Sequence, residues 1–180
     1  MAESPQWYFA YGSNMGANVF QKRRKINPLT AEAAVIATHT LCFNVMGVPY
    51  TDPAMGGIRL AKAGDVPVHG VAYLLTPDDM RRVIVSEGGG IAYTTGFLTA
   101  TLQKDSSKVT VTALLARHHI SIEHERLPSE RYLVSFRLIQ SLDTGRERAI
   151  VARALSKEPY GSAHIQTVTN PPLPHRKMAF

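Results

Sequence analysis

The sequence predicts an α+β fold whose sheet is closed into a barrel or strongly curled. Several short segments rich in β-branched and aromatic residues occur in the first two thirds of the chain, at the close spacing typical of such sheets. Two further segments repeat apolar residues at helical spacing. The 180 residues contain no internal repeat and no linker rich in Pro, Gly or Ser, so we expect one domain.

Composition excludes several classes of protein. The chain is 44% hydrophobic and 19% charged, a globular mixture that argues against disorder and coiled coil. No run of about 18 apolar residues occurs and the first residues do not resemble a secretory signal, so we expect a cytoplasmic protein. The single cysteine, Cys42, cannot form an internal disulfide. The net charge of +6 is compatible with an anionic substrate, a nucleic-acid surface or neither.

The first strand is expected at residues 7–11, whose sequence WYFAY is typical of a buried strand. Gly12, Ser13 and Asn14 follow, and three turn-forming residues in a row end the strand. We expect a short helix over residues 15–25 with Asn14 as its N-cap. A strand, a turn and a helix start in this order leave backbone N–H groups unpaired, and such groups can bind negative charge.

The middle of the chain is expected to consist of strands. Apolar residues alternate loosely over residues 33–45, and residues 58–63 and 66–75 are also typical of strands. Residues 91–102 and 108–117 are rich in Thr, Val, Tyr and Phe. The polar residues between these two segments predict a hairpin.

Two helices are well indicated and a third is weaker. Thr76 and Pro77, followed by two aspartates, predict a helix that ends at the glycines of residues 88–90. A second helix is expected from Ser129 to about Asp143, and a third over residues 146–156. We assign residues 1–6 to an N-terminal tail, 7–156 to the domain and 157–180 to a Pro-rich C-terminal extension.

Glu87 stands out among the fourteen carboxylates because the first predicted helix ends beside it. The helix dipole opposes an acid at that end by about 0.3–1 kcal/mol in exposed positions. The dipole and partial burial would both raise the pKa of Glu87, the direction that a general base needs near neutral pH. On the residues alone a solvated helix end is the commoner outcome, and a catalytic carboxylate is the alternative.

Residues 8–15, YFAYGSNM, resemble the N-terminal signature of the γ-glutamylcyclotransferase family. Further segments resemble the family's motifs in the same order, namely GGI at 56–58, VHGVAY at 68–73, Glu87 with the following glycine, Tyr93, and PSERY at 128–132. YGSN alone is a short motif, whereas the ordered set over residues 7–156 is specific. The chain is identified on this basis as similar to the γ-glutamylcyclotransferase-like (AIG2-like) superfamily, which implies a small mixed β-barrel with flanking α-helices and no metal or cofactor.

The resemblance also implies roles for individual residues. Glu87 matches the catalytic glutamate and is expected to be the general acid/base. The N-terminal motif is expected to hold the γ-glutamyl group and the developing oxyanion, and two tyrosines to shape the pocket. The implied substrate-binding residues are Tyr8, Phe9, Ala10, Tyr11, Gly12, Ser13, Asn14, Tyr93 and Tyr132. The glycine-rich residues 88–91, and the absence of a tyrosine from 109–116, depart from the pattern and leave the leaving amine open.

Other signals have simpler interpretations. His118, His119 and His124 match no zinc spacing, so we interpret them as part of a surface loop. Cys42 lies in an apolar segment and is interpreted as a buried structural thiol. The basic run KRRK at residues 22–25 has no stacking aromatic residues beside it, so we interpret it as a solvated helix face rather than a nucleic-acid site.

The principal expectation is a lyase that cyclises a γ-glutamyl amide to 5-oxoproline and releases an amine, the substrate's own α-amino group being the nucleophile. Family members linked to fungal toxin clusters suggest secondary metabolism as one setting. One alternative is an enzyme with the same fold and site that catalyses another cyclisation or proton transfer in secondary-metabolite biosynthesis. The second is a non-catalytic binding module with an acidic partner. We expect the protein to bind a small γ-glutamyl substrate and to bind neither nucleic acid nor a membrane. Whether it forms a homodimer is left open.

Overall fold

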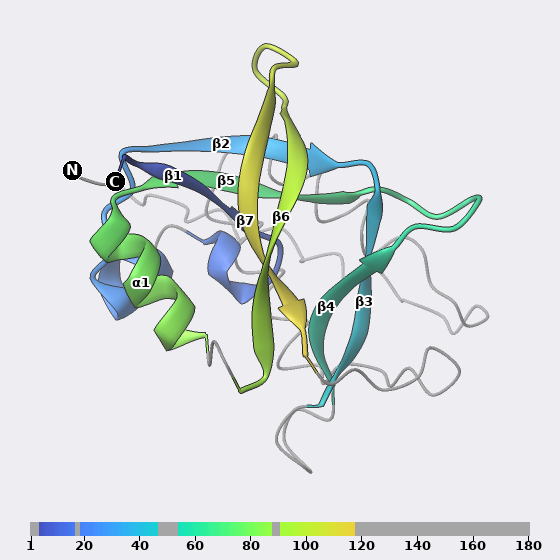
Figure 1. The fold of residues 1–180 in the computed structure, drawn as a ribbon, viewed down its shortest axis with the longest axis horizontal. Coiled ribbons are helices and arrows are strands. Elements are labelled where there is room, and N and C mark those ends of the chain that lie inside the picture. Colours follow the sequence, from blue (N-terminus) through green and yellow to red (C-terminus); the bar gives the residue numbers. More distant parts are fainter. Residues whose placement is uncertain (1–3, 17–18, 47–53, 88–90, 118–180) are drawn as a thin grey trace, which may run out of the picture.

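The computed structural model describes residues 4–16, 19–46, 54–87 and 91–117. Strands in the order β1-β5-β2-β6-β7 close into a barrel, and β3 and β4 form a separate two-stranded sheet (Figure 1). The strands are β1 (Gln6–Ala10), β2 (Thr30–Ile36), β3 (His39–Met46), β4 (Ala54–Leu60), β5 (Val68–Leu75), β6 (Tyr93–Leu102) and β7 (Lys108–Ala116). The helical elements are the 3-10 turn η1 (Ser13–Met15), the π-helix η2 (Val19–Arg23) and α1 (Pro77–Ser86).

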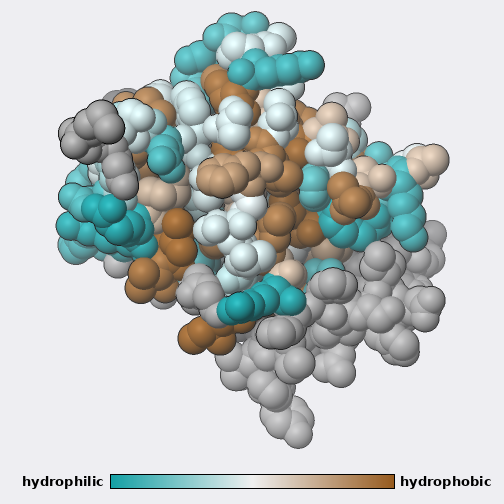
Figure 2. All heavy atoms as spheres, viewed as in Figure 1, coloured by the Kyte–Doolittle hydropathy of each residue, from teal (hydrophilic) through white to brown (hydrophobic). Residues whose placement is uncertain are grey.

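The barrel is mixed, because β1 is antiparallel to β5 on one side and parallel to β7 on the other. The strand β2 is antiparallel to both of its neighbours, β5 and β6. The strands β6 and β7 form the expected hairpin. Figure 2 shows hydrophilic residues at the tip of this hairpin and hydrophobic residues over the middle of the strands. The predicted fold class, an α+β fold with a small mixed β-barrel and flanking α-helices, is confirmed.

Buried side chains form two clusters, because successive residues of β1 point to opposite faces of the sheet. Phe9 belongs to the cluster contributed by the strands, which fills the barrel. Tyr8 and Ala10 belong to the other, which also contains Phe20 of η2 and Val83 of α1. This second cluster packs the helical elements against the barrel. The side chain of Tyr8 therefore points to the side where η1 and α1 end.

Gly70 permits the close approach of β1 to β5. A Cβ atom at this position would overlap the carbonyl oxygen of Ala10 and lie 2.7 Å from the Cζ atom of Phe9. A side chain cannot be accommodated there without moving the backbone of β1. The glycine in VHGVAY is thus required by the pairing that closes one side of the barrel.

The helix α1 begins and ends as the sequence predicts. The Thr76 hydroxyl accepts a hydrogen bond from the backbone N–H of Asp79 at 3.2 Å, and Pro77 occupies the first turn. The helix ends at Ser86, and Glu87 is the next residue. The glycines expected to end it, residues 88–90, lie outside the described residues, as do the helices expected from Ser129 and over residues 146–156. The expected domain boundaries stay predictions.

Two expectations about secondary structure are wrong. Residues 15–25 do not form one helix capped by Asn14, because Gly12 precedes η1 and Asn14 lies inside this turn. Residues 33–45 do not form one continuous segment either, since the chain turns after Ile36 and β3 begins at His39. This division lets β2 join the barrel while β3 pairs with β4. In the part of the chain that the structure describes, no helix has the length and apolar character needed to span a membrane.

Candidate active site

A small cleft lies between the N-terminal motif and the end of α1. It is lined by Tyr8, Tyr11, Gly12, Ser13, Asn14, Gly56, Glu87, Tyr93 and Leu114. Its volume is about 30 Å³, which holds about two water molecules. The structure thus brings Glu87 to the turn that follows β1, although the two are more than seventy positions apart in the sequence.

Two of the expected substrate-binding residues, Phe9 and Ala10, do not line the cleft, and a third stays a prediction. Phe9 is buried inside the barrel and Ala10 is buried in the other cluster. Their backbones pair with β5, at Ala72 and Val71 respectively. Tyr132 lies outside the described residues. Within β1, only Tyr8 lines the cleft.

The side-chain amide of Asn14 fixes the polarity of the cleft wall. Its Oδ1 atom accepts a hydrogen bond from the Gly12 N–H at 3.2 Å, and its Nδ2 atom donates to the Tyr8 hydroxyl at 2.5 Å. Because a backbone N–H can only donate, the atom that faces Gly12 must be the oxygen, and the amide orientation follows. The Tyr8 oxygen therefore accepts, which leaves its hydrogen available for an acceptor in the cleft.

Tyr8 is held in its neutral form. Burial, followed by the negative charge of Glu87, raises the pKa of the Tyr8 hydroxyl well above its ordinary value. A neutral phenol keeps the hydrogen that it can donate. Tyr8 is accordingly a hydrogen-bond donor next to the carboxylate of Glu87.

The other tyrosines of this region support the backbone around the cleft. The Tyr73 hydroxyl donates to the carbonyl of Met15 at 2.6 Å, and the Tyr93 hydroxyl donates to the carbonyl of Gly56 at 3.1 Å. The Tyr11 hydroxyl donates to the carbonyl of Leu114. These bonds tie η1, β4 and β7 to their neighbours and define the shape of the cleft.

The turn offers fewer free N–H groups than its three residues suggest. The Gly12 N–H is bonded to Asn14, and the Met15 N–H is bonded to the Gly12 carbonyl at 3.0 Å. Within the described ranges, no acceptor is found for the N–H groups of Ser13 and Asn14. These two groups are the backbone donors that could meet an anion.

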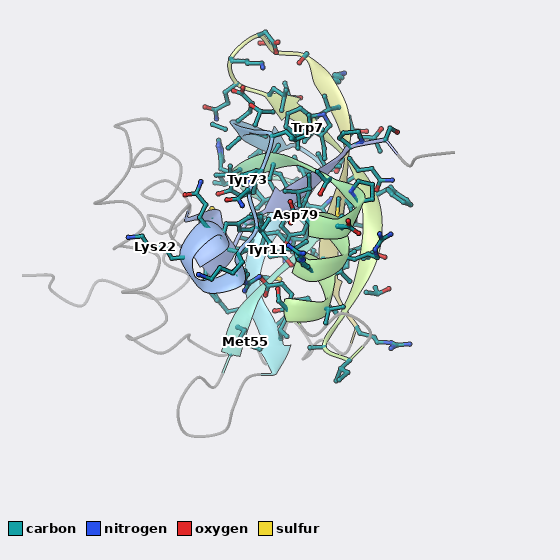
Figure 3. All side chains as sticks on the ribbon, turned by 90° about the vertical axis from the view of Figure 1, so that its left-hand side faces the viewer. Trp7, Tyr11, Lys22, Met55, Tyr73 and Asp79 are labelled. Atoms are coloured by element: carbon teal, nitrogen blue, oxygen red, sulfur yellow. The ribbon has the colours of Figure 1, made fainter. Side chains whose placement is uncertain are left out.

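Glu87 forms an ion pair with Arg24, which directly follows η2: an Nη1–H of Arg24 donates to Oε1 of Glu87. The side chains are 18% and 16% exposed respectively, so Glu87 is not a solvated helix end. In Figure 3, Tyr11 lies between η2 and α1, whereas Lys22 points from η2 away from α1. The expectation of a solvated face over residues 22–25 is therefore wrong for Arg24.

Arg24 was missed because a basic run in a sequence does not show which of its members turns inward. The available signal was indirect: an acid at a helix C-terminus faces like charge from the helix dipole and needs a nearby cation. Arg24 supplies that cation from a segment that is distant in sequence. The pair is the main electrostatic feature of the site.

No other chemical centre is found among the residues that the structure describes. No group of three or more His, Cys, Asp or Glu side chains there could hold a metal ion. Cys42 is buried, as predicted, and its thiol lies 3.2 Å from Oδ1 of Asn44. The histidines at 118, 119 and 124 lie outside the described residues.

The fold, a small mixed barrel in which a carboxylate at a helix end and a Gly-Ser-Asn turn line one cleft, is of the γ-glutamylcyclotransferase-like class. No family model matches the chain. It is 55% identical over 123 residues to γ-glutamyl cyclotransferase gliK of Claviceps purpurea, covering 66% of this chain and 55% of that protein. It is 31% identical over 154 residues to γ-glutamyl cyclotransferase verK of Clonostachys rogersoniana, covering 74% of this chain and 84% of that protein. The chain belongs to the γ-glutamyl cyclotransferase family.

The solved structures agree with the fold. A structure described as a γ-glutamyl cyclotransferase superposes with a TM-score of 0.67 at 16% identity, covering 92% of this chain and 94% of that one. The chain spans about half the length of two of the curated relatives that it matches, with 55% and 53% of their residues covered.

Proposed function

We propose that this protein is a γ-glutamyl cyclotransferase, which converts a γ-glutamyl amide to 5-oxoproline and a free amine. The observation that carries the proposal is the position of Glu87, which lines the same small cleft as the Ser13–Asn14 turn. The names of the curated relatives support the same activity. The cleft thus combines a group that can move protons with donors that can stabilise an oxyanion.

The reaction needs no nucleophile from the protein. The α-amino nitrogen of the substrate attacks its own γ-carbonyl carbon and closes a five-membered lactam, and the bond from that carbon to the leaving nitrogen then breaks. Holding these groups in the attacking geometry supplies much of the rate, since the attack is intramolecular. The protein's part is to position the chain, move protons and stabilise charge.

Glu87 is the proposed general acid/base. It accepts a proton from the substrate's ammonium group, which makes the amine nucleophilic, and delivers a proton to the leaving nitrogen. One carboxylate can do both because the two nitrogens are bonded to the same carbon, the former γ-carbonyl carbon, in the tetrahedral intermediate. General acid/base catalysis of this kind contributes about 10²–10⁴-fold in rate.

The oxyanion of the tetrahedral intermediate is proposed to accept hydrogen bonds from the N–H groups of Ser13 and Asn14 and from the Tyr8 hydroxyl. Loss of one such donor typically costs about 3 kcal/mol of transition-state stabilisation. Asn14 contributes twice, through its own N–H and through the side-chain amide that orients Tyr8. A glycine at position 12 leaves room for the substrate to approach this backbone.

The test is product identification. The full-length protein is incubated with γ-glutamyl amino acids, γ-glutamyl amines and γ-glutamyl peptides, and the products are analysed by mass spectrometry. We expect 5-oxoproline and the free amine in equal amounts from at least one of these classes. Release of glutamate instead would indicate hydrolysis, and turnover of no γ-glutamyl compound would contradict the proposal.

A further inference from the structure

A second and larger space, an open groove on the surface, borders the Arg24–Glu87 ion pair at Arg24. This groove has a volume of about 510 Å³ and is lined by Arg24, Arg81, Arg82, Val85 and Ser86. Glu87 lines the small cleft, whereas Arg24 lines the groove. The ion pair therefore joins a residue that lines the cleft to a residue that lines the groove.

The groove has apolar walls and positively charged groups. Val85 is 75% exposed, and the methylene stems of arginines add further apolar surface. Arg81 and Arg82 form ion pairs with Asp78 and Asp79 at 2.6 Å and 3.4 Å, and the side chains of both arginines are more than 60% exposed. Such exposed pairs contribute little and are screened by salt.

Arg24 differs from the other two arginines because it is mostly shielded from water, with 16% of its side chain exposed. A guanidinium in such surroundings binds a carboxylate more strongly than an exposed one does, and its planar fork favours a bidentate contact. Its present partner is the carboxylate of Glu87, on the cleft side. A carboxylate that arrives in the groove would compete for the same cation.

We propose that the groove binds the leaving-amine half of the substrate, and that Arg24 recognises a carboxylate on that half. This inference rests on the proposed function. Glu87 has to reach the leaving nitrogen, so the leaving group begins at Glu87 and extends away from the Ser13–Asn14 turn. The groove is the space next to Glu87 on the Arg24 side, because Arg24 lines the groove and is paired with Glu87, which lines the cleft.

The chemical class of the leaving group follows. In an amino acid, the carbon next to the scissile nitrogen carries a carboxylate, which can meet Arg24, and an apolar side chain, which can lie along the groove. When Arg24 turns to the substrate carboxylate, Glu87 loses its ion-pair partner and its oxygen becomes available for the proton of the ammonium group. Carboxylate recognition is thereby coupled to the release of the general base.

The test uses analogues that bind but cannot cyclise. N-glutaryl-L-alanine and N-glutaryl-L-alaninamide lack the α-amino nucleophile and differ only in carboxylate against carboxamide on the leaving half. Isothermal titration calorimetry gives the Kd of each analogue for the wild type, Arg24→Gln and Arg59→Gln. Arg59 is the matched control, since it forms a similarly shielded ion pair with Asp65, with 21% and 24% of the side chains exposed, and lines neither space.

The wild type is expected to bind the carboxylate about tenfold more tightly than the carboxamide, which corresponds to about 1.4 kcal/mol. Arg24→Gln is expected to bind the two equally, and Arg59→Gln to keep the wild-type ratio. Arg24→Lys retains the positive charge but lacks the planar guanidinium, and we expect its preference for the carboxylate analogue to be at least threefold weaker than that of the wild type. If Arg24→Gln does not fold, the preference measured for Arg24→Lys tests the groove assignment in its place.

Binding and turnover separate the two proposals. A carboxylate preference that depends on Arg24, without 5-oxoproline from any substrate, would keep the groove assignment and overturn the proposed function. Equal binding of the two analogues by the wild type, binding of neither, or an unchanged preference in the Arg24 variants would overturn the groove assignment. None of these binding results tests the proposed function, which is tested by the release of 5-oxoproline.

Discussion

The side-chain amide of Asn14 donates to the Tyr8 hydroxyl at 2.5 Å and so directs the hydrogen of the phenol towards the cleft. Tyr8 lies in β1, and Asn14 lies six residues later in η1. The contact couples the end of the first strand to the turn that follows it. Three donors, two backbone N–H groups and one phenol, are thereby gathered at one end of the cleft.

Replacing Tyr8 with Phe should lower kcat about 10²–10³-fold, because one proposed oxyanion donor is lost. The ring remains, so the packing of the cluster that contains Phe20 should change little. Steady-state kinetics of 5-oxoproline release measures the effect. Tyr73→Phe is the comparison, since it removes a buried hydroxyl that donates to Met15 and does not line the cleft. An equal loss in both variants would argue against a catalytic role for the Tyr8 hydroxyl.

Asn14→Asp should also impair catalysis, by a different route. The carboxylate can still accept from the Gly12 N–H, but it cannot donate to Tyr8, so the phenol would donate to Asp instead of to the substrate. We expect kcat to fall and the free energy of unfolding to fall by about 1–3 kcal/mol, because a charged carboxylate would be buried where a neutral amide stood. Asn44→Asp, a change at another buried asparagine away from the cleft, should affect stability without a comparable effect on kcat.

Alkaline pH should destabilise the protein through Tyr8. The pKa of Tyr8 in the folded state is raised above the ordinary value of 10.0, so above pH 10.0 the unfolded chain loses this proton while the folded chain keeps it. Stability is fully present below pH 10.0 and is lost as the pH rises towards the raised folded pKa. Between pH 9 and 11 the wild type should lose about 1.4 kcal/mol more than Tyr8→Phe in urea denaturation. Equal losses would show that Tyr8 is not shielded as described.

Gly70→Ala should destabilise the barrel, because the added methyl group would overlap the Ala10 carbonyl and the Phe9 ring. Overpacking of this kind costs about 1–3 kcal/mol. Gly64→Ala is an informative contrast: the added Cβ meets nothing within 4 Å, but φ is +86°, so the cost comes from backbone conformation alone. Thermal unfolding measures the loss of stability of each variant relative to the wild type. A Gly70→Ala protein as stable as the wild type would contradict the packing of β1 on β5.

Local patterns were sufficient for β1, the β6–β7 hairpin and α1, because each carries its own signal in the form of an aromatic run, a polar turn or a Thr-Pro cap. The division between β2 and β3 carries no glycine or proline, and it is decided by which strands each one pairs with. The prediction of a helix capped by Asn14 was wrong because the Asn14 side chain bonds to Gly12 and Tyr8 and does not cap a helix.

The candidate site shows the same division between local and long-range information. The Gly-Ser-Asn turn and Glu87 could be singled out from the sequence, the first as a run of turn formers and the second as an acid at a helix end. Their meeting at one cleft was implied only by resemblance to a family. Arg24 could not be foreseen, because its inward direction depends on how η2 packs against α1 and on the carboxylate that it meets there.

The most direct test of the proposed function is the rate of 5-oxoproline release by Glu87→Gln, with Glu32→Gln as the matched control. Glu32 also forms an ion pair, with Lys104, and its side chain is 22% exposed, but it lies away from the cleft. We expect Glu87→Gln to lose about 10²–10⁴-fold in kcat while it still binds N-glutaryl-L-alanine, and Glu32→Gln to match the wild type. Release of 5-oxoproline by Glu87→Gln at the wild-type rate would contradict the assignment of Glu87 as the general acid/base.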